Sequence, residues 1–160
     1  MEIIELKQTQ NQDVCELVKI SKSAFDSDVS VGATQAGGPP GYDSEKWHLQ
    51  MMNFGKMFTA FADDKIVGGA IVFPDKNKSE ICVGRIFISP DCFCKGYGTL
   101  VMQKLEEEFS DIHTWNLDTP LWNVRTNKFY VKLGYVETSR DNESVFYTKN
   151  DLIIKFTWTN

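Results

Sequence analysis

The 160-residue sequence lacks the features that mark several common classes of protein. No apolar run approaches the ~20 residues that a helix needs to span a bilayer. The first ten residues lack the basic stretch followed by an apolar stretch that marks a secretory signal. A net charge of −5 leaves little of the basic surface that nucleic-acid binding usually requires. We therefore expect a cytoplasmic protein that binds neither membranes nor nucleic acid.

The sequence also has few residues that could bind a metal ion or form a disulfide. The chain has four cysteines and two histidines. Cys92 and Cys94 form a single C-x-C pair without a matching pair or a nearby histidine cluster, and so we predict no metal site. The cysteines are scattered through the chain, which favours reduced thiols over a disulfide framework. Cys92 and Cys94 are interpreted as packed or surface thiols, with a thiol that relays an acyl group as the alternative.

The composition that remains is typical of a globular protein. Hydrophobic residues make up 42% of the chain and charged residues 24%. A chain of this length is expected to form a single domain, residues 1–160, that buries roughly two-thirds of the surface of its unfolded state. The acidic balance is compatible with a small cationic substrate that is steered by the surface charge.

The first half of the sequence predicts strands, two helices and one long loop. Apolar residues at helical spacing predict a helix from Asn11 or Asp13 to Phe25, and Ser44 is predicted to cap a second helix. Residues 27–43 are rich in Gly, Pro, Ser and Thr, and we expect either a functional lid or a mobile connector. The strands predicted in this half are Ile3–Leu6, Met57–Ala62, Lys65–Phe73 and Ile81–Ile88, the last three as an antiparallel meander.

The stretch Ile81–Phe109 has the clearest chemical purpose. It predicts a buried strand, a tight glycine loop at Lys95–Thr99 and an amphipathic helix. Backbone amides at the start of such a helix converge on one spot, where the helix dipole also favours negative charge. This loop therefore predicts a site for a phosphate or pyrophosphate group.

The last third of the chain predicts the end of one crossover, a further helix and two closing strands. A strand over His113–Leu117 should pair in parallel with the strand before the glycine loop. Thr119 is predicted to cap a helix that starts at Pro120 and ends before Gly134. The closing strands are predicted over Tyr135–Ser139 and Leu152–Trp158, with a turn at Asp141-Asn142 between them.

Four segments of the sequence occur in an order that matches one known family. They are Ile86–Pro90, Lys95–Gly98, Asn123 with Tyr130 seven residues later, and Lys132–Tyr135. Together with the order of the predicted elements, they resemble the GNAT superfamily of acetyl-CoA-dependent N-acetyltransferases. The resemblance implies an α+β fold, in which a mixed, mostly antiparallel, twisted sheet of about seven strands is flanked by about four helices.

The resemblance also implies how acetyl-CoA would bind. The backbone of Phe87 and Ile88 would pair with the pantetheine arm, because the strand that carries them splays away from its parallel neighbour. Asn123 would hydrogen-bond the same arm, and Tyr130 would stand near the sulfur. The amides that would hold the pyrophosphate belong to Lys95, Gly96, Tyr97, Gly98 and Thr99, with glycine at two positions to allow close approach.

One residue departs from the family pattern. The family usually has Gln or Arg three positions before the first glycine of the loop, and this chain has Phe93. The change removes one polar contact, and so we expect weaker or rearranged phosphate binding.

The reaction class assigns roles to a few side chains. A primary amine with a pKa of ~10.4 is mostly charged at pH 7 and must lose a proton before it attacks a thioester. Glu80 and Asp118 are the candidate bases, although Asp118 is also a candidate helix cap. The Tyr130 phenol would act as the general acid toward the departing thiolate, with a packed core tyrosine as the alternative. His48 is interpreted as a surface or packed histidine, and Arg85 either orients a substrate carboxylate or forms a structural ion pair.

The predicted function is acetyl transfer from acetyl-CoA to a small amine or to a protein amino group by direct attack. The alternatives are a sensor that binds acyl-CoA without catalysis and a transferase for a longer acyl group. The acceptor pocket is expected between residues 27–43, the helix after them and the final strands. The exposed edge of the last strand offers a surface for a homodimer.

Overall fold

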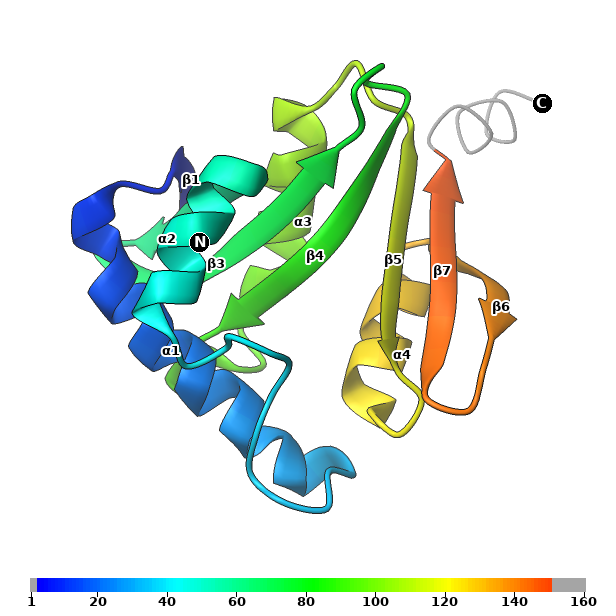
Figure 1. The fold of residues 1–160 in the computed structure, drawn as a ribbon, viewed down its shortest axis with the longest axis horizontal. Helices are drawn as coiled ribbons and strands as arrows, with labels where there is room; N and C mark the ends of the chain where they lie inside the picture. Colours follow the sequence, from blue (N-terminus) through cyan, green and yellow to red (C-terminus); the bar gives the residue numbers. More distant parts are fainter. Residues whose placement is uncertain (1–2, 151–160) are drawn as a thin grey trace.

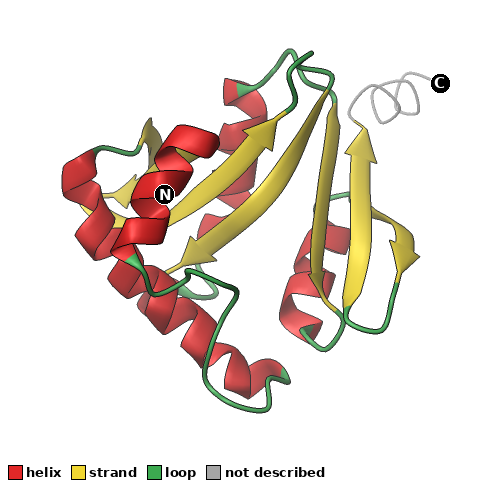
Figure 2. Ribbon diagram, viewed as in Figure 1, coloured by secondary structure: helices red, strands yellow, loops and turns green. Residues whose placement is uncertain are grey.

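The computed structural model describes residues 3–150, which form one sheet with helices on both of its faces (Figure 1). Figure 2, which is coloured by secondary structure, shows the same sheet between its two layers of helices. No helix within these residues is long and apolar enough to cross a membrane. The strands are β1 (Ile4–Gln8), β2 (Lys56–Ala62), β3 (Lys65–Pro74), β4 (Glu80–Ile88), β5 (Thr114–Pro120), β6 (Val136–Arg140) and β7 (Ser144–Asn150). The α-helices are α1 (Val14–Asp26), α2 (Glu45–Phe54), α3 (Tyr97–Glu108) and α4 (Val124–Lys132), and the short 3-10 helices are η1 (Asn11–Asp13), η2 (Ser27–Val31) and η3 (Pro90–Cys92).

The strands follow the order β1-β2-β3-β4-β5-β7-β6 across the sheet. Every neighbouring pair is antiparallel except β4 and β5, which run parallel and are joined by the crossover through α3. The predicted meander of β2, β3 and β4 is confirmed, and so is the mixed sheet of about seven strands with about four helices.

A tight turn fixes the register of the first predicted hairpin. Asp63 and Asp64 join β2 to β3 with φ angles of 49° and 63°. Two consecutive positive φ angles define the primed turn that matches the twist of paired strands, and Asp tolerates that conformation better than most residues. The turn therefore lies where the sequence predicts it.

A bulge divides β4 into two halves. Two consecutive residues of β3 lie opposite Arg85 and Val83, so that Gly84 between them has no partner on β3. A Cβ atom at this position would lie 2.4 Å from an aromatic ring of β3, which leaves room only for glycine. A bulge bends its strand and re-aims the side chains that follow it. The second half of β4 consequently takes a different direction from the first half.

Parallel pairing between β4 and β5 stops after three positions. It runs from Glu80 opposite Thr114 to Cys82 opposite Asn116. Beyond these residues the two strands diverge, while β5 stays paired with β7 along its whole length (Figure 1). The sheet is therefore open between the C-terminal ends of its two parallel strands.

Each face of the sheet carries its own apolar core. On the face covered by α1 and α2, Leu17 of α1 belongs to one buried cluster with Ile71 and Phe87. On the opposite face, α3 and α4 pack onto a larger cluster, which includes the fully buried Trp115. The buried helix residues of that second cluster are Tyr97, Val101, Met102, Leu105 and Tyr130.

One helix begins later than the sequence predicts. Thr119 and Pro120 do not start α4, so the predicted cap and first residue are wrong. Both residues belong to β5 and pair with β7, which gives this stretch its hydrogen bonds in the sheet. The helix is capped instead by Asn123, whose side chain accepts a hydrogen bond from the Thr126 amide. Two capping signals lie close together in the sequence, and pairing with a distant strand selects the second one.

The sequence places the final strand too late. β7 starts at Ser144, directly after a turn in which the Asp141 carboxylate accepts hydrogen bonds from the amides of Glu143 and Ser144 at 2.8 and 2.7 Å. The turn predicted at Asp141-Asn142 is thus present, and the strand that follows it was missed. The strand predicted over Leu152–Trp158 lies outside the described residues.

The contrast between buried and exposed helix residues gives a test of the core. Leu105 of α3 is fully buried, whereas the Leu49 side chain on α2 is 42% exposed. We expect Leu105→Ala to lower the free energy of unfolding by about 2–5 kcal/mol, because it removes packed methyl groups and leaves a cavity. The matched change Leu49→Ala should cost about 1 kcal/mol or less. Urea denaturation measures both, and equal losses would contradict the assigned core.

Candidate active site

The open part of the sheet continues as a cleft of about 1070 Å³. Four segments line it: the end of α1 with the loop after it, β4 from Gly84 to Ile88, the loop that leads into α3, and the end of β5 with the start of α4. Residues 32–39 of the long loop contribute to the lining, as expected for a binding segment. A cleft of this size is large enough for a ligand of cofactor size.

The β4 wall of the cleft has a free edge. Phe87 and Ile88 pair with β3 through the opposite edge of the strand. Pairing with β5 ends at Cys82, and so the cleft side of β4 is unpaired at these two positions. Backbone amides and carbonyls along such an edge can accept an extended ligand as an additional strand.

The two glycines of the loop before α3 serve different purposes. Gly96 is the residue before α3 and has a φ of 79°, a left-handed conformation that favours glycine, while the space around its missing Cβ is open. At Gly98, a Cβ would lie 3.2 Å from the Phe129 ring. Gly96 is thus needed for its backbone conformation, and Gly98 for its close packing on α4. The Lys95 side chain is exposed, and the loop residues that line the cleft are Gly96, Tyr97, Gly98 and Thr99.

Tyr130 lies deep in the same cleft. It comes from α4, is 6% exposed and lines the cavity. Its ring lies edge-on to Tyr135, with 5.6 Å between the centroids. Burial raises the pKa of Tyr130 far above its ordinary value, and the nearby Asp118 carboxylate adds to the shift. The phenol is therefore protonated at neutral pH and has a hydrogen to donate.

The two candidate bases lie in different places. Asp118 sits near the C-terminal end of β5, is exposed and lines the cleft. Glu80 lies at the other end, where β4 and β5 are still paired, and its carboxylate accepts a hydrogen bond from Asn116 at 3.2 Å. The structure thus brings Asp118 and Tyr130 together at the cleft and leaves Glu80 outside its lining.

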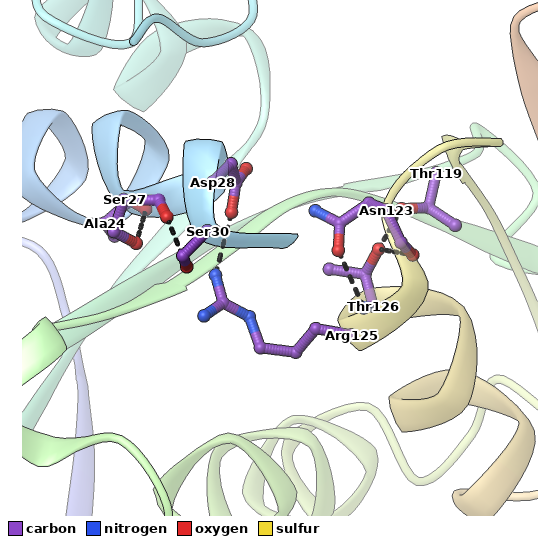
Figure 3. A network of polar contacts seen from close by, with 8 residues as sticks. All are labelled: Ala24, Ser27, Asp28, Ser30, Thr119, Asn123, Arg125 and Thr126. Carbon is purple, nitrogen blue, oxygen red and sulfur yellow. Dashed lines mark hydrogen bonds and ion pairs between the residues drawn. The ribbon is translucent and has the colours of Figure 1, made fainter. Parts of the chain in front are cut away.

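An ion pair that the sequence did not reveal joins η2 to the start of α4, and both of its residues line the cleft (Figure 3). The Arg125 guanidinium at the start of α4 donates to the Asp28 carboxylate of η2 at 2.7 Å, across 97 residues of sequence. Burial raises the pKa of Asp28, and both Arg125 and a hydrogen bond from the Asn123 side chain oppose that shift. Neither partner belongs to a local motif, so no spacing in the sequence pointed to them.

Phe93, the residue that departs from the family pattern, contacts the same arginine. The Arg125 guanidinium carbon lies 4.5 Å from the centroid of the Phe93 ring, which is a cation–π contact. A cation from α4 therefore lies beside the position where the family usually has a polar side chain. The aromatic ring holds this cation near the glycine loop.

Asn123 has a structural role in addition to the one implied by the resemblance. It is 2% exposed, and its Oδ1 accepts a hydrogen bond from the Thr126 amide at 3.1 Å, which caps α4. The Thr126 hydroxyl is in turn 2.6 Å from the Thr119 hydroxyl (Figure 3). The cap therefore fixes the start of α4 against the end of β5, where both elements line the cleft.

Two further candidates lie on the face covered by α2. His48 is fully buried, its Nδ1 lies 2.8 Å from the Ser44 carbonyl, and burial lowers its pKa. It is therefore the packed histidine of the two alternatives. Arg85 lines the cleft and stacks on Trp47, with 3.9 Å between the guanidinium carbon and the ring centroid. Its Nη2 donates to the Pro40 carbonyl, and no carboxylate among the described residues forms an ion pair with it.

The described residues contain no group of three or more His, Cys, Asp or Glu side chains that could hold a metal ion. Cys92 lines the cleft, and Cys94, which follows it in the loop, has a φ of 67°. Both are free thiols.

Comparison with known proteins agrees with this geometry. Residues 23–135 match the sequence model of the acetyltransferase (GNAT) family. The uncharacterized protein YrkN of Bacillus subtilis (strain 168) is 30% identical over 74 residues, which cover 46% of this chain and 40% of YrkN. The match therefore spans less than half of that relative.

Solved structures share the fold at low sequence identity. The PaiA N-acetyltransferase of Thermoplasma acidophilum, in complex with coenzyme A, is similar with a TM-score of 0.78 and 17% identity, over 92% of this chain and 99% of that one. The ribosomal-protein-S18-alanine N-acetyltransferase of Escherichia coli is similar with a TM-score of 0.69 and 16% identity, over 92% and 94% of the two chains.

The cap at the start of α4 gives a test of this wall of the cleft. We expect Asn123→Ala to lower the free energy of unfolding by about 1 kcal/mol, because the Thr126 amide loses its acceptor. Asn123→Ser keeps an oxygen that can cap the helix and should retain most of that stability. Urea denaturation of both variants measures the difference, and equal losses would show that the cap contributes little.

Proposed function

The chain belongs to the acetyltransferase (GNAT) family, and we propose that it transfers an acetyl group from acetyl-CoA to a primary amine of a small molecule or a protein. The observation that carries this proposal is the splayed pair of β4 and β5, which leaves a free strand edge beside a glycine loop and a buried phenol. These three features serve one purpose together, which is to hold an acyl thioester in an extended conformation with its sulfur near Tyr130.

The residues of the cleft fit acetyl-CoA as co-substrate. The free edge at Phe87 and Ile88 would pair with the amides of the pantetheine arm. The first amides of α3, after Gly96, would bind the pyrophosphate, because they lack partners within the helix and lie at its positive end. The Arg125 guanidinium also lies beside this loop, and its charge is paired with the Asp28 carboxylate. Acetyl-CoA would supply the activated acetyl group.

The side chains of the cleft can divide the proton transfers of the reaction. In the proposed mechanism Asp118 takes a proton from the acceptor ammonium, directly or through one water, and the free amine attacks the thioester carbon. A C–N bond forms as the C–S bond breaks. Tyr130 gives a proton to the sulfur as negative charge develops there, and the second proton that the attacking nitrogen loses restores the phenol. Its raised pKa keeps the phenol protonated until that moment.

The direct test is incubation with acetyl-CoA and a broad panel of amines. We expect at least one amine to accelerate the release of the CoA thiol, with formation of the acetylated amine shown by mass spectrometry. Binding of acetyl-CoA without acceleration by any amine or protein substrate would instead support a sensor. Faster release from longer acyl-CoA thioesters would support a transferase for a longer chain.

The role of Tyr130 can be separated from its packing. We expect Tyr130→Phe to lower kcat roughly 10²-fold, because the sulfur loses its proton donor. The dissociation constant for acetyl-CoA should change little, since the ring remains in place. Tyr147→Phe is the matched control: this neighbour is also buried, its ring centroid lies 6.4 Å from that of Tyr130, and its hydroxyl donates to Asn127 outside the cleft. An unchanged kcat in Tyr130→Phe would remove the phenol from the mechanism.

A further inference from the structure

We infer that the acceptor carries a carboxylate as well as its amine, and that Arg85 binds this carboxylate at the end of the cleft beside Trp47 and Pro40. The substrate class would then be an amino acid or a similar zwitterion. This inference rests on the proposed acetyl transfer and names the chemistry of its acceptor.

The charges that line the cleft give the first argument. Among the described residues of the lining, four are charged, and they are Asp28, Arg85, Asp118 and Arg125. Asp28 and Arg125 neutralise each other in an ion pair. One anion on β5 and one cation on β4 remain, on the two walls that diverge from the paired end of the sheet. A ligand with one ammonium and one carboxylate complements both charges.

The surroundings of Arg85 give the second argument. Its Nη2 donates to the Pro40 carbonyl, whereas its Nη1 is buried and has no hydrogen-bond partner in the described structure. A charged donor that is buried without a partner has lost its hydrogen bonds to water and gained none in return, which is unfavourable. Burial also lowers the pKa of Arg85 to about 10, and no neighbouring carboxylate opposes the shift. The guanidinium thus lacks an anion.

The position of Arg85 is fixed as a binding residue requires. The bulge at Gly84 immediately precedes it and sets its direction from β4. The stack on Trp47 holds the plane of the guanidinium. Arg85 and Phe87 are two residues apart on one strand, so their side chains point to the same face, about 7 Å apart along the strand. The carboxylate would therefore bind close to the proposed position of the pantetheine arm.

The loop that contacts Arg85 supplies a hydrogen-bond acceptor, the Pro40 carbonyl, that a ligand can replace. Pro40 belongs to the loop of residues 32–43, in which Gly37 and Gly41 have positive φ angles. A carbonyl oxygen is a weaker acceptor for a guanidinium than a carboxylate, which binds two of its nitrogens at once. An entering carboxylate would take the place of the Pro40 carbonyl, and this part of the loop would move aside.

The inference is tested with acceptors that differ only in the carboxylate. Each amino acid is paired with its decarboxylated amine, for example phenylalanine with 2-phenylethylamine and lysine with 1,5-diaminopentane. For the wild-type protein we expect kcat/KM to be roughly 10- to 150-fold higher for the amino acid of the preferred pair, the contribution of a hydrogen bond to a charged group. Arg85→Gln should bring this ratio toward one, and Arg85→Lys should keep part of it.

Binding of products gives a readout that does not depend on turnover. Calorimetry in the presence of CoA should show that the N-acetyl amino acid binds the wild-type protein more tightly than the N-acetyl amine, and that Arg85→Gln removes the difference. A wild-type preference for the decarboxylated amines and their products, or equal loss of both in Arg85→Gln, would overturn the inference. Transfer to amines without a carboxylate would then leave the acetyltransferase proposal standing, whereas absence of transfer to any acceptor would contradict that proposal itself.

Discussion

The short parallel pairing of β4 and β5 is the constraint on which the rest of the structure depends. Three paired positions join the two halves of the sheet, and the bulge at Gly84 turns β4 away directly after them. A fully paired sheet would leave no free edge at Phe87 and Ile88, and no cleft for the glycine loop, Asp118 and Tyr130 to line. Both the proposed cofactor site and the proposed acceptor site are therefore consequences of where the pairing stops.

Local patterns predicted most of the fold because periodicity and turn residues act over short distances. The meander, its turn at Asp63-Asp64 and the crossover through α3 are examples. The start of α4 was predicted wrongly, because pairing of Thr119 with β7 outweighs its capping potential. β7 was missed because its alternation is short and follows a turn closely.

The candidate site likewise has features that could be predicted from the sequence and contacts that could not. The glycine loop follows from the local sequence pattern and the Asn123 and Tyr130 positions from the family resemblance, and their roles toward a ligand stay predictions. Contacts over long separations could not be read from spacing. The Asp28–Arg125 pair joins residues 97 positions apart, and the Arg85–Pro40 hydrogen bond joins residues 45 positions apart. Only the folded chain shows which of the charges in the cleft are already neutralised.

The ion pair between Asp28 and Arg125 has a mechanical consequence. The three rungs between β4 and β5 join the two halves of the sheet at one end of the opening, and this ion pair joins them again between η2 and α4. Arg125 is the more exposed partner, with 38% of its side chain accessible, so dissolved salt screens the ion pair more than the backbone hydrogen bonds of the three rungs. The link between η2 and α4 across the cleft is therefore weaker in concentrated salt than in dilute buffer, whereas the pairing of β4 with β5 is kept.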